Sequence, residues 1–189
     1  MNPSKESVIK AAYELFEQQG YSETTVKQIS ERAEVAYGTV YFHFRSGKDD
    51  VLSEIARMVL FDFYKILELE YQMNTTKELK DTVYNQMMSA FKVIDKNRRI
   101  MQVFWEAKGK SDIVYNNFKD LEDSFIEKIT EDIIENRSRG IGKPVNHKLT
   151  SRALMHMVWG FIWDYTLDST DKPEEISETV VTLYMHGIY

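Results

Sequence analysis

The sequence predicts an all-α fold, and three of its features carry that prediction. Apolar side chains recur at intervals of three and four residues along most of the 189-residue chain, which is the spacing of one helix face. Serine, threonine or asparagine precedes several of these stretches, where each can cap a helix. Most of the eight glycines and three prolines fall near the ends of the stretches, where they can end or begin a helix.

The first stretch of the chain predicts three short helices. A helix is expected over residues 4–20, and Gly20 stops it as a C-terminal cap. Its inner face is formed by Val8, Ile9, Ala12, Leu15 and Phe16. Thr24 is expected to cap a second helix, and after a tight turn at residues 34–35 a third is expected over 36–42. Two helices joined by so brief a turn form a helix-turn-helix unit.

An aromatic run, Gly-Thr-Val-Tyr-Phe-His-Phe, occupies residues 38–44. Val40 and Phe44 are expected to turn inward. An exposed Tyr41 and His43 on so short a helix suit phosphate oxygens better than a hydrophobic core, because both carry polar groups. The run therefore indicates that this end of the protein lies on DNA.

Many N-terminal positions together form a recognisable pattern. They are Ile9-Lys-Ala-Ala-Tyr-Glu-Leu-Phe16, Gly20-Tyr21, Thr24-Thr25-Val26, Ile29, Ala33, Val35, Gly38-Thr39-Val40-Tyr41 and Phe44-Arg-Ser-Gly-Lys48. In order and spacing this stretch resembles the DNA-binding domain of the tetracycline-repressor (TetR) family. Three positions depart from the family pattern: Glu34 replaces a usual glycine, Ala36 a usual serine or threonine, and Gly47 is an extra residue before the lysine. Ala36 removes a hydroxyl that could cap the third helix or bind a phosphate.

The expected DNA contacts lie on the second and third helices and at the start of the fourth. They are Thr25, Lys27, Ala36, Tyr37, Thr39, Tyr41, His43 and Lys48. Tyr37 and Thr39 are expected to reach base edges in the major groove. The charged and remaining hydroxyl or imidazole side chains are expected to hold phosphates, together with the backbone amides that begin the fourth helix.

Composition agrees with a regulator that binds DNA through one face. The formal charge is −6, but basic and acidic side chains are equal in number through Lys48, so the negative surplus lies beyond it. No cysteine is present, which excludes disulfides, thiol catalysis and thiolate metal sites. No apolar run approaches the roughly 20 residues of a membrane span, and no signal peptide is evident. We expect a cytoplasmic protein with no membrane partner.

The rest of the chain also reads as helices. A long helix over residues 48–71 is expected to join a DNA-binding domain, residues 1–47, to an effector-binding and dimerisation domain, residues 48–189. Further helices are expected over 75–95, 97–108, 111–136, 146–167 and 173–187. The glycine-rich, basic loop at 137–143 lacks the strand that precedes phosphate-binding loops, so it is interpreted as a helix connection.

The last two helices predict a dimer. Residues 153–163 are apolar nearly all round, so two sides of that helix need covering. The final helix offers a second apolar face, and the family resemblance also implies dimerisation here. The expected interface residues are Ala153, Met157, Gly160, Ile176, Val180 and Tyr184.

The body of the chain is rich in aromatic and methionine side chains, which suit the walls of a ligand cavity. The resemblance implies a small-molecule pocket among these helices. We expect a cavity of at least roughly 300 Å³ between the long helix and the later ones. Its expected lining residues are Tyr64, Phe91, Phe104, Trp105, Phe118 and Trp159.

These features predict a homodimeric, ligand-responsive regulator, most simply a repressor released from a palindromic operator by a small apolar or aromatic effector. No cofactor and no enzymatic activity are expected, because the four histidines are scattered and no serine has a nucleophile context. Two alternatives stay open. One is a DNA-binding regulator controlled by a protein partner without a small-molecule pocket. The other is a helical carrier or enzyme that contains a helix-turn-helix.

Overall fold

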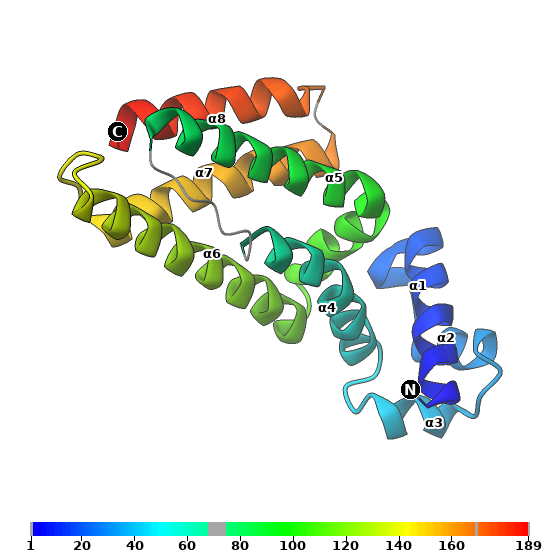
Figure 1. Ribbon diagram of the computed structural model, residues 1–189. Coiled ribbons are helices and arrows are strands. Elements are labelled where there is room, and N and C mark those ends of the chain that lie inside the picture. The colour runs from blue at the N-terminus through cyan, green and yellow to red at the C-terminus, as the bar shows by residue number, and fades with distance from the viewer. Residues whose placement is uncertain (1, 68–74, 169, 189) are drawn as a thin grey trace. The chain divides into compact units, whose positions relative to one another are not determined.

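The computed structural model describes residues 2–67, 75–168 and 170–188 (Figure 1). Its helices are α1 (Pro3–Glu23), α2 (Val26–Arg32), α3 (Tyr37–His43), α4 (Lys48–Leu67), α5 (Thr76–Lys108), α6 (Asp112–Ser138), α7 (His147–Leu167) and α8 (Pro173–Ile188). The described residues include no strand, and the all-α prediction is confirmed. The last four residues of the helix expected over 48–71 lie outside the described ranges.

The chain forms two compact units. The first contains the residues up to 61 together with 97–119, and the second contains 62–96 and the residues from 120 onward. Helices α4, α5 and α6 each contribute residues to both units. Within α5, Asn97 has a non-helical backbone (φ −123°, ψ 18°). The two helices expected over 75–95 and 97–108 are therefore one element with an interruption at Asn97.

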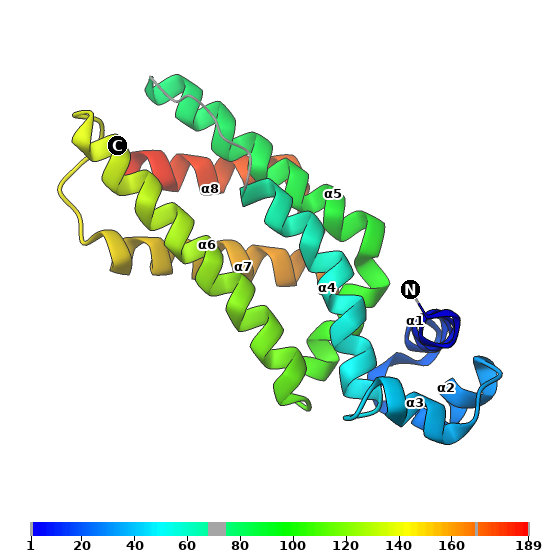
Figure 2. The same cartoon turned by 60° about the horizontal axis from the view of Figure 1, so that its bottom comes forward.

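The first three helices pack against one another in the first unit (Figures 1 and 2). Asn2 caps α1, and Gly20 interrupts it with φ 80°, as expected of a glycine stop. The second helix is capped by Thr25 rather than by Thr24. The Thr25 hydroxyl accepts the Gln28 N–H, and the Gln28 side chain accepts the Thr25 N–H, which completes a capping box. Thr24 is buried instead, and its hydroxyl donates to the Gly20 carbonyl.

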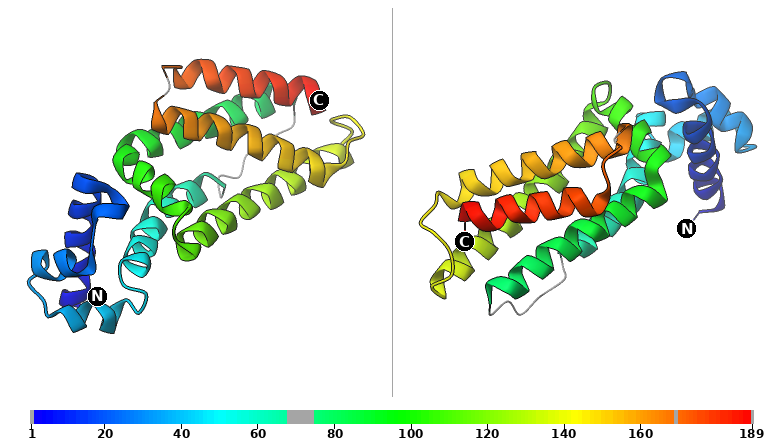
Figure 3. Two further views of the ribbon diagram at one scale, coloured as in Figure 1. Left: turned by 180° about the vertical axis from the view of Figure 1, so that it is seen from behind. Right: turned by 90° about the horizontal axis from the view of Figure 1, so that it is seen from above.

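The second unit is built by the first part of α5, most of α6, and α7 and α8. Figure 3 shows α8 running beside α7 and beside the first part of α5. Leu79, Ile133, Tyr184 and Ile188 form a buried cluster there. Lys143 closes this unit, because its N–H donates to the Ile188 carbonyl and its ammonium to the His186 carbonyl, both at 2.6 Å. The basic loop thus caps the C-terminal end of α8.

Helix boundaries elsewhere follow the sequence signals. Thr75 and Glu78 form the expected capping box at the start of α5. Ser111 accepts the Val114 N–H at the start of α6, and Asn146 accepts the Leu149 N–H at the start of α7. These short polar side chains satisfy backbone donors that a helix leaves without partners, which explains why they mark its beginning.

Candidate nucleic-acid interface and ligand cavity

Helix α3 presents its large side chains outward. Val40 is buried, while Tyr37 is 54% exposed, Tyr41 40% and Phe42 80%. A helix that only packed into a core would bury its aromatic side chains, because they have the most apolar area to remove from water. The exposed face of α3 is therefore available for a partner.

The two tyrosine side chains of α3 contact each other. Their rings lie 5.4 Å apart edge to face, and their hydroxyl oxygens are 3.4 Å apart. Hydrogen bonding to Tyr37, followed by burial, raises the pKa of Tyr41. Gly47 lets Tyr41 lie here: it has φ 63°, and a Cβ at this position would be 2.9 Å from Val26 Cγ2 and 3.3 Å from Tyr41 Cε1. The extra residue in the family pattern thus has a steric reason to be glycine.

The remaining expected DNA contacts lie in the N-terminal head, which is the part of the chain that holds α1, α2 and α3 (residues 2–47), and they differ in exposure and in hydrogen bonding. Lys27 is exposed and 3.9 Å from Glu31, which is a loose ion pair. Thr39 is half-buried, and Ala36 is exposed and caps α3 without a side-chain hydrogen bond. His43 Nε2 is 2.8 Å from the Ser4 hydroxyl. These residues lie on α2, on α3 and in the turn between them.

The Lys48 ammonium forms hydrogen bonds within the protein. Its ammonium donates to the carbonyls of Tyr21 (2.8 Å) and Thr24 (2.9 Å), and it lies 4.1 Å from the centroid of the Tyr21 ring. Burial lowers the pKa of Lys48, against the attraction of Asp49. Since two of its three donors are committed, we omit Lys48 from the proposed phosphate contacts.

The N-terminus of α4 also interacts with side chains of the protein itself. Asp49 and Asp50 stand in its first turn, where carboxylates are stabilised by the positive end of the helix dipole. Asp50 accepts the Ser46 N–H at 2.7 Å, and Asp49 accepts the Tyr21 hydroxyl. Two anions beside these amides oppose a third, so we also omit this helix end from the proposed phosphate contacts.

Glu106 holds the interruption of α1. Its carboxylate accepts the backbone N–H of Tyr21 (2.9 Å) and of Ser22 (3.0 Å), and Lys110 lies 3.2 Å away. Burial alone would raise the pKa of Glu106, but hydrogen bonds from Ser22 and Tyr21 outweigh it and lower the pKa to about 2. Glu106 and Lys48 thus anchor the end of α1 from two elements of the same compact unit.

Phe42 is a surface residue that the sequence analysis did not select. Its ring lies 5.0 Å from that of His43, and it is the most exposed of the large apolar side chains on α3. Its exposure could have been predicted from its position two residues after Val40. On a helix, a residue two positions from a buried one points away from the buried face.

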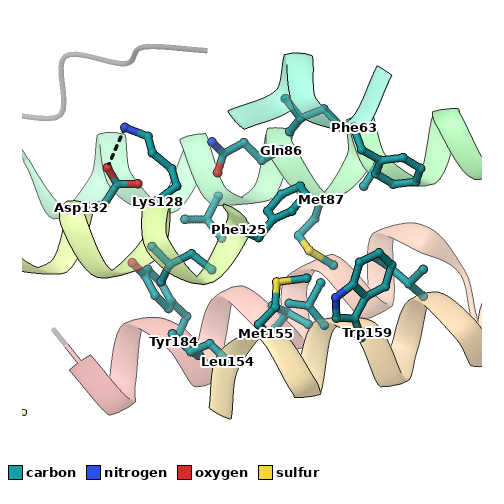
Figure 4. A pocket seen from close by; sticks show the side chains of 17 residues that line it. Phe63, Gln86, Met87, Phe125, Lys128, Asp132, Leu154, Met155, Trp159 and Tyr184 are labelled. Carbon is teal, nitrogen blue, oxygen red and sulfur yellow. Dashed lines mark ion pairs between the residues drawn. The ribbon is translucent and has the colours of Figure 1, made fainter. Parts of the chain in front are cut away.

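A cavity of about 110 Å³ lies within the second unit (Figure 4). Its walls come from α4, α5, α6, α7 and α8. They are Phe63, Ile66, Val83, Gln86, Met87, Ala90, Phe125, Lys128, Ile129, Asp132, Leu154, Met155, Val158, Trp159, Ile162, Val180 and Tyr184. The cavity lies where it was expected, between α4 and the later helices, but it is smaller than the expected volume.

The cavity wall contains an ion pair. Lys128 Nζ is 3.2 Å from Asp132 Oδ1, one turn apart on α6 (Figure 4). Burial raises the pKa of Asp132 even though Lys128 opposes the shift. For Lys128, burial would lower the pKa, but the attraction and hydrogen bond of Asp132 together with the charges of Glu131 and Glu135 raise it. The carboxylate is thus the less well stabilised partner.

The expected lining set needs correction, since only Trp159 belongs to the cavity wall. Phe104 and Phe118 pack on each other in the first unit, with ring centroids 5.8 Å apart. Trp105 also belongs to the first unit, where it is exposed. Within the second unit, the ring of Phe91 lies 4.9 Å from that of Tyr165, and Tyr64 is half-buried beside the α4 residues that do line the cavity.

The wall residues that were missed on α6 share one helix face. Phe125, Lys128, Ile129 and Asp132 are spaced i, i+3, i+4 and i+7 on α6. The spacing of this face can be seen in the sequence. It did not indicate a cavity wall, because a lysine and an aspartate four residues apart usually mark a solvent-exposed face.

Three of the expected dimer residues also need correction. Ile176, Val180 and Tyr184 are buried in their own subunit, and Val180 and Tyr184 line the cavity. The apolar face of α8 is therefore used by the core of the second unit. Ala153 and Gly160 are exposed, and Met157 is half-buried.

An open groove lies on the outer side of α7 and α8. We call it the outer α7–α8 groove, and it is lined by Val145, Leu149, Thr150, Ala153, Leu154, Met157, Leu183, Gly187 and Ile188. Leu149 is 59% exposed and Leu183 53%. These two exposed leucines on adjacent helices give the groove an apolar surface that faces solvent.

Among the described residues, no group of histidine, aspartate or glutamate side chains could hold a metal ion. None of the described helices is long and apolar enough to cross a membrane.

Comparison with known proteins agrees with this geometry. Residues 8–55 match the family model "Bacterial regulatory proteins, tetR family". The chain is 23% identical over 189 residues to the transcriptional repressor KstR2 of Mycolicibacterium smegmatis, covering 97% of this chain and 90% of that protein.

Solved structures show the same fold. NalD of Pseudomonas aeruginosa, the secondary repressor of the MexAB-OprM multidrug efflux pump, superposes with a TM-score of 0.77 at 23% identity, covering 98% of this chain and 95% of that one. The SmeT–triclosan complex gives 0.75 at 19% identity, covering 98% and 91%. Residues 8–55 thus form a DNA-binding domain of the TetR family, and the chain as a whole has the fold of these regulators.

Proposed function

We propose that the protein is a homodimeric repressor that binds a twofold-symmetric operator and leaves it when a small apolar or aromatic molecule enters the cavity of the second unit. The observation that carries the proposal is the outward presentation of Tyr37, Tyr41 and Phe42 on α3. A short helix that follows a capped helix and exposes its polar and aromatic side chains fits the major groove.

On this proposal, Tyr37 and Thr39 read base edges, and Lys27, Tyr41 and His43 contact phosphates. Thr25 is left out for the same reason as Lys48, because its hydroxyl donates to Gln28 Oε1 within the cap. The cap made by Thr25 holds the first turn of α2 in place, and the Lys27 ammonium in that turn stays exposed. Phosphate contacts position such a domain, and base contacts give it sequence preference.

Two observations support a repressor that responds to ligand. KstR2 and NalD carry the word repressor in their descriptions, and SmeT was solved with triclosan, a small aromatic molecule. The cavity wall is mostly aromatic, methionine and aliphatic side chains, which repack around apolar ligands. Helices α4, α5 and α6 line this cavity and also build the first unit, so a change in their packing has a covalent route to the head. By linkage, ligand and operator then weaken each other's binding by the same factor.

The DNA contact is tested with the duplex adjacent to the protein's own gene. Lys27→Ala should weaken binding to all duplexes alike and lower the log–log salt slope by about 0.9 for each phosphate that is no longer neutralised, twice that per dimer. Tyr37→Ala should instead reduce discrimination between this duplex and random DNA. The matched control is Lys80→Ala, which removes the same charge from an exposed position on α5. Equal effects of Lys27→Ala and Lys80→Ala would reject the proposed phosphate contact.

The outer α7–α8 groove is the proposed dimer interface. A stable interface buries more than roughly 1,000 Å² in total, and the exposed leucines would supply its apolar centre. Leu183→Asp should give monomers in sedimentation, because two carboxylates would be buried by symmetry. Asn85→Asp adds the same charge at an exposed site on α5 and should leave the dimer intact. A monomeric wild-type protein at micromolar concentration would reject the two-half-site operator as well.

A further inference from the structure

The ion pair in the cavity wall divides the cavity into unlike ends. Lys128 and Asp132 are the charged members of the described lining. In Figure 4 this pair and Tyr184 lie towards one side, Phe63 and Trp159 lie towards the other, and the sulfur atoms of Met87 and Met155 are between them. A ligand that fills this space meets charge at one end and apolar side chains at the other.

The charges around the pair favour a cation. An anion that approached Lys128 would also meet Asp132, whose carboxylate is only 3.2 Å from the ammonium. Glu131 and Glu135 add negative potential on the same helix, since both raise the pKa of Lys128 and of Asp132. Both glutamates are exposed and Glu135 is paired with Arg139, so the balance at the cavity wall is set mainly by Asp132. This carboxylate already neutralises Lys128 and would repel an added anion.

Of the two groups in the ion pair, Asp132 is the one that would be stabilised more by an added charge of opposite sign. It is 24% exposed against 38% for Lys128, and burial outweighs the attraction of Lys128 in raising its pKa. A second donor would restore interactions that the carboxylate loses on leaving water. Tyr184 and Phe125, which line the same wall, offer ring faces that attract cations.

We propose that the cavity selects a monovalent organic cation, an amine on a small apolar or aromatic body, with the amine at Asp132 and the body towards Trp159. The inference rests on the proposed function, because it names the ligand class of the same cavity. It separates two kinds of ligand that the apolar walls alone would accept equally.

A matched series of probes tests this proposal on the full-length protein. 4-Ethylbenzylamine, 4-ethylbenzyl alcohol and 4-ethylbenzoate share one body and differ in charge, and all exceed the resting cavity of about 110 Å³, so each binds as the methionine and aromatic walls move apart. Calorimetric titration should give affinities in the order amine, alcohol, carboxylate. The amine should exceed the alcohol by about 10-fold, the gain expected of one charge-assisted hydrogen bond.

Two variants test whether Asp132 is the residue that binds the amine. Asp132→Asn should lower amine affinity by about 10-fold and leave alcohol affinity unchanged, and the alcohol thereby reports that the variant cavity is intact. Glu131→Gln removes a neighbouring exposed carboxylate that does not line the cavity, and it should change amine affinity less than about twofold.

The outcomes separate the two proposals. Tightest binding by the carboxylate, or an amine affinity unaffected by Asp132→Asn, overturns the cation inference and leaves the cavity as a ligand site. Binding of none of the three probes overturns the ligand site itself, and the cation inference with it. Amine preference that depends on Asp132 supports both.

Discussion

The N-terminal head and the cavity of the second unit are held together by different interactions. In the head, charged groups bind the backbone directly: Lys48 donates to two carbonyls, and Glu106 accepts two N–H groups. The cavity is walled mainly by aliphatic, aromatic and methionine side chains, together with the Lys128–Asp132 ion pair. Directional hydrogen bonds fix one geometry, whereas dispersion contacts among flexible side chains accept several. The head is built to keep its shape, and the cavity is built to change it.

The largest effect that tests this contrast is expected at Gly47. Gly47→Ala should destabilise the protein by about 2–4 kcal/mol, because an alanine is strained at φ 63° and its Cβ would meet Val26 at 2.9 Å. Gly140 is the matched control, since its φ is 80° with no neighbouring atom within 4 Å, and Gly140→Ala should cost only about 1 kcal/mol. Urea unfolding measures both. Equal costs would show that the head relaxes around the added carbon and is less rigid than we infer.

A smaller effect is expected at Glu106. Glu106→Gln should lower the free energy of unfolding by about 1 kcal/mol near neutral pH, a value reduced for the partial exposure of the carboxylate. The pKa of Glu106 is lowered from 4.5 to about 2 in the folded protein, so its contribution is complete above pH 4.5 and is lost as the pH falls towards 2. The stability difference between wild type and variant should therefore shrink across that window.

Glu127 supplies the control for this measurement, because it is an exposed glutamate on α6. Glu127→Gln should change stability little at any pH. A difference between wild type and Glu106→Gln that stays constant from pH 5 to about 2 would show that the ionised carboxylate is not what holds the end of α1.

The smallest effect is expected in the cavity wall. Met155→Leu should cost clearly less than about 1.5 kcal/mol, because the adjoining space absorbs the change of shape. Met101 is fully buried in the first unit, and Met101→Leu should cost more for the same exchange. Thermal unfolding of the two variants compares them directly. If the cavity variant were the more damaging one, the wall would be a fixed surface rather than an adaptable one.

Much of the fold was readable from local signals. The Thr75 capping box and Asn146 each marked a helix start, and Gly20 marked the interruption of α1, three residues before that helix ends. The one cap assigned to the wrong residue, Thr24 in place of Thr25, is an error of a single position between two adjacent threonines. Only the fold decides which of the two is buried.

The sites depended on longer-range facts. Exposure of Tyr37 and Tyr41 followed from the helix pattern, but the inward turn of Lys48 depends on carbonyls more than twenty residues earlier in the chain. The prediction of the cavity wall was wrong for the same reason, because the wall also depends on contacts between distant parts of the chain. Phe104 and Trp159 look equally suited to a ligand in sequence, and only the division into two units separates them. Likewise, the apolar face of α8 could meet its own core or a second subunit, and periodicity does not distinguish the two.

On the proposed function, the size of the cavity determines how fast the protein responds to a ligand. At about 110 Å³ it is smaller than the roughly 150 Å³ cavity that holds a benzene molecule, and drug-sized ligands need roughly 300 Å³ or more. A large effector therefore enters only when the methionine and aromatic walls have moved apart, and its apparent affinity falls by the fraction of time that they are open. Association then becomes slower than collision, and escape is slowed by the same gate. A regulator built in this way responds little to a brief pulse of ligand and stays in its ligand-bound state for some time after a sustained one.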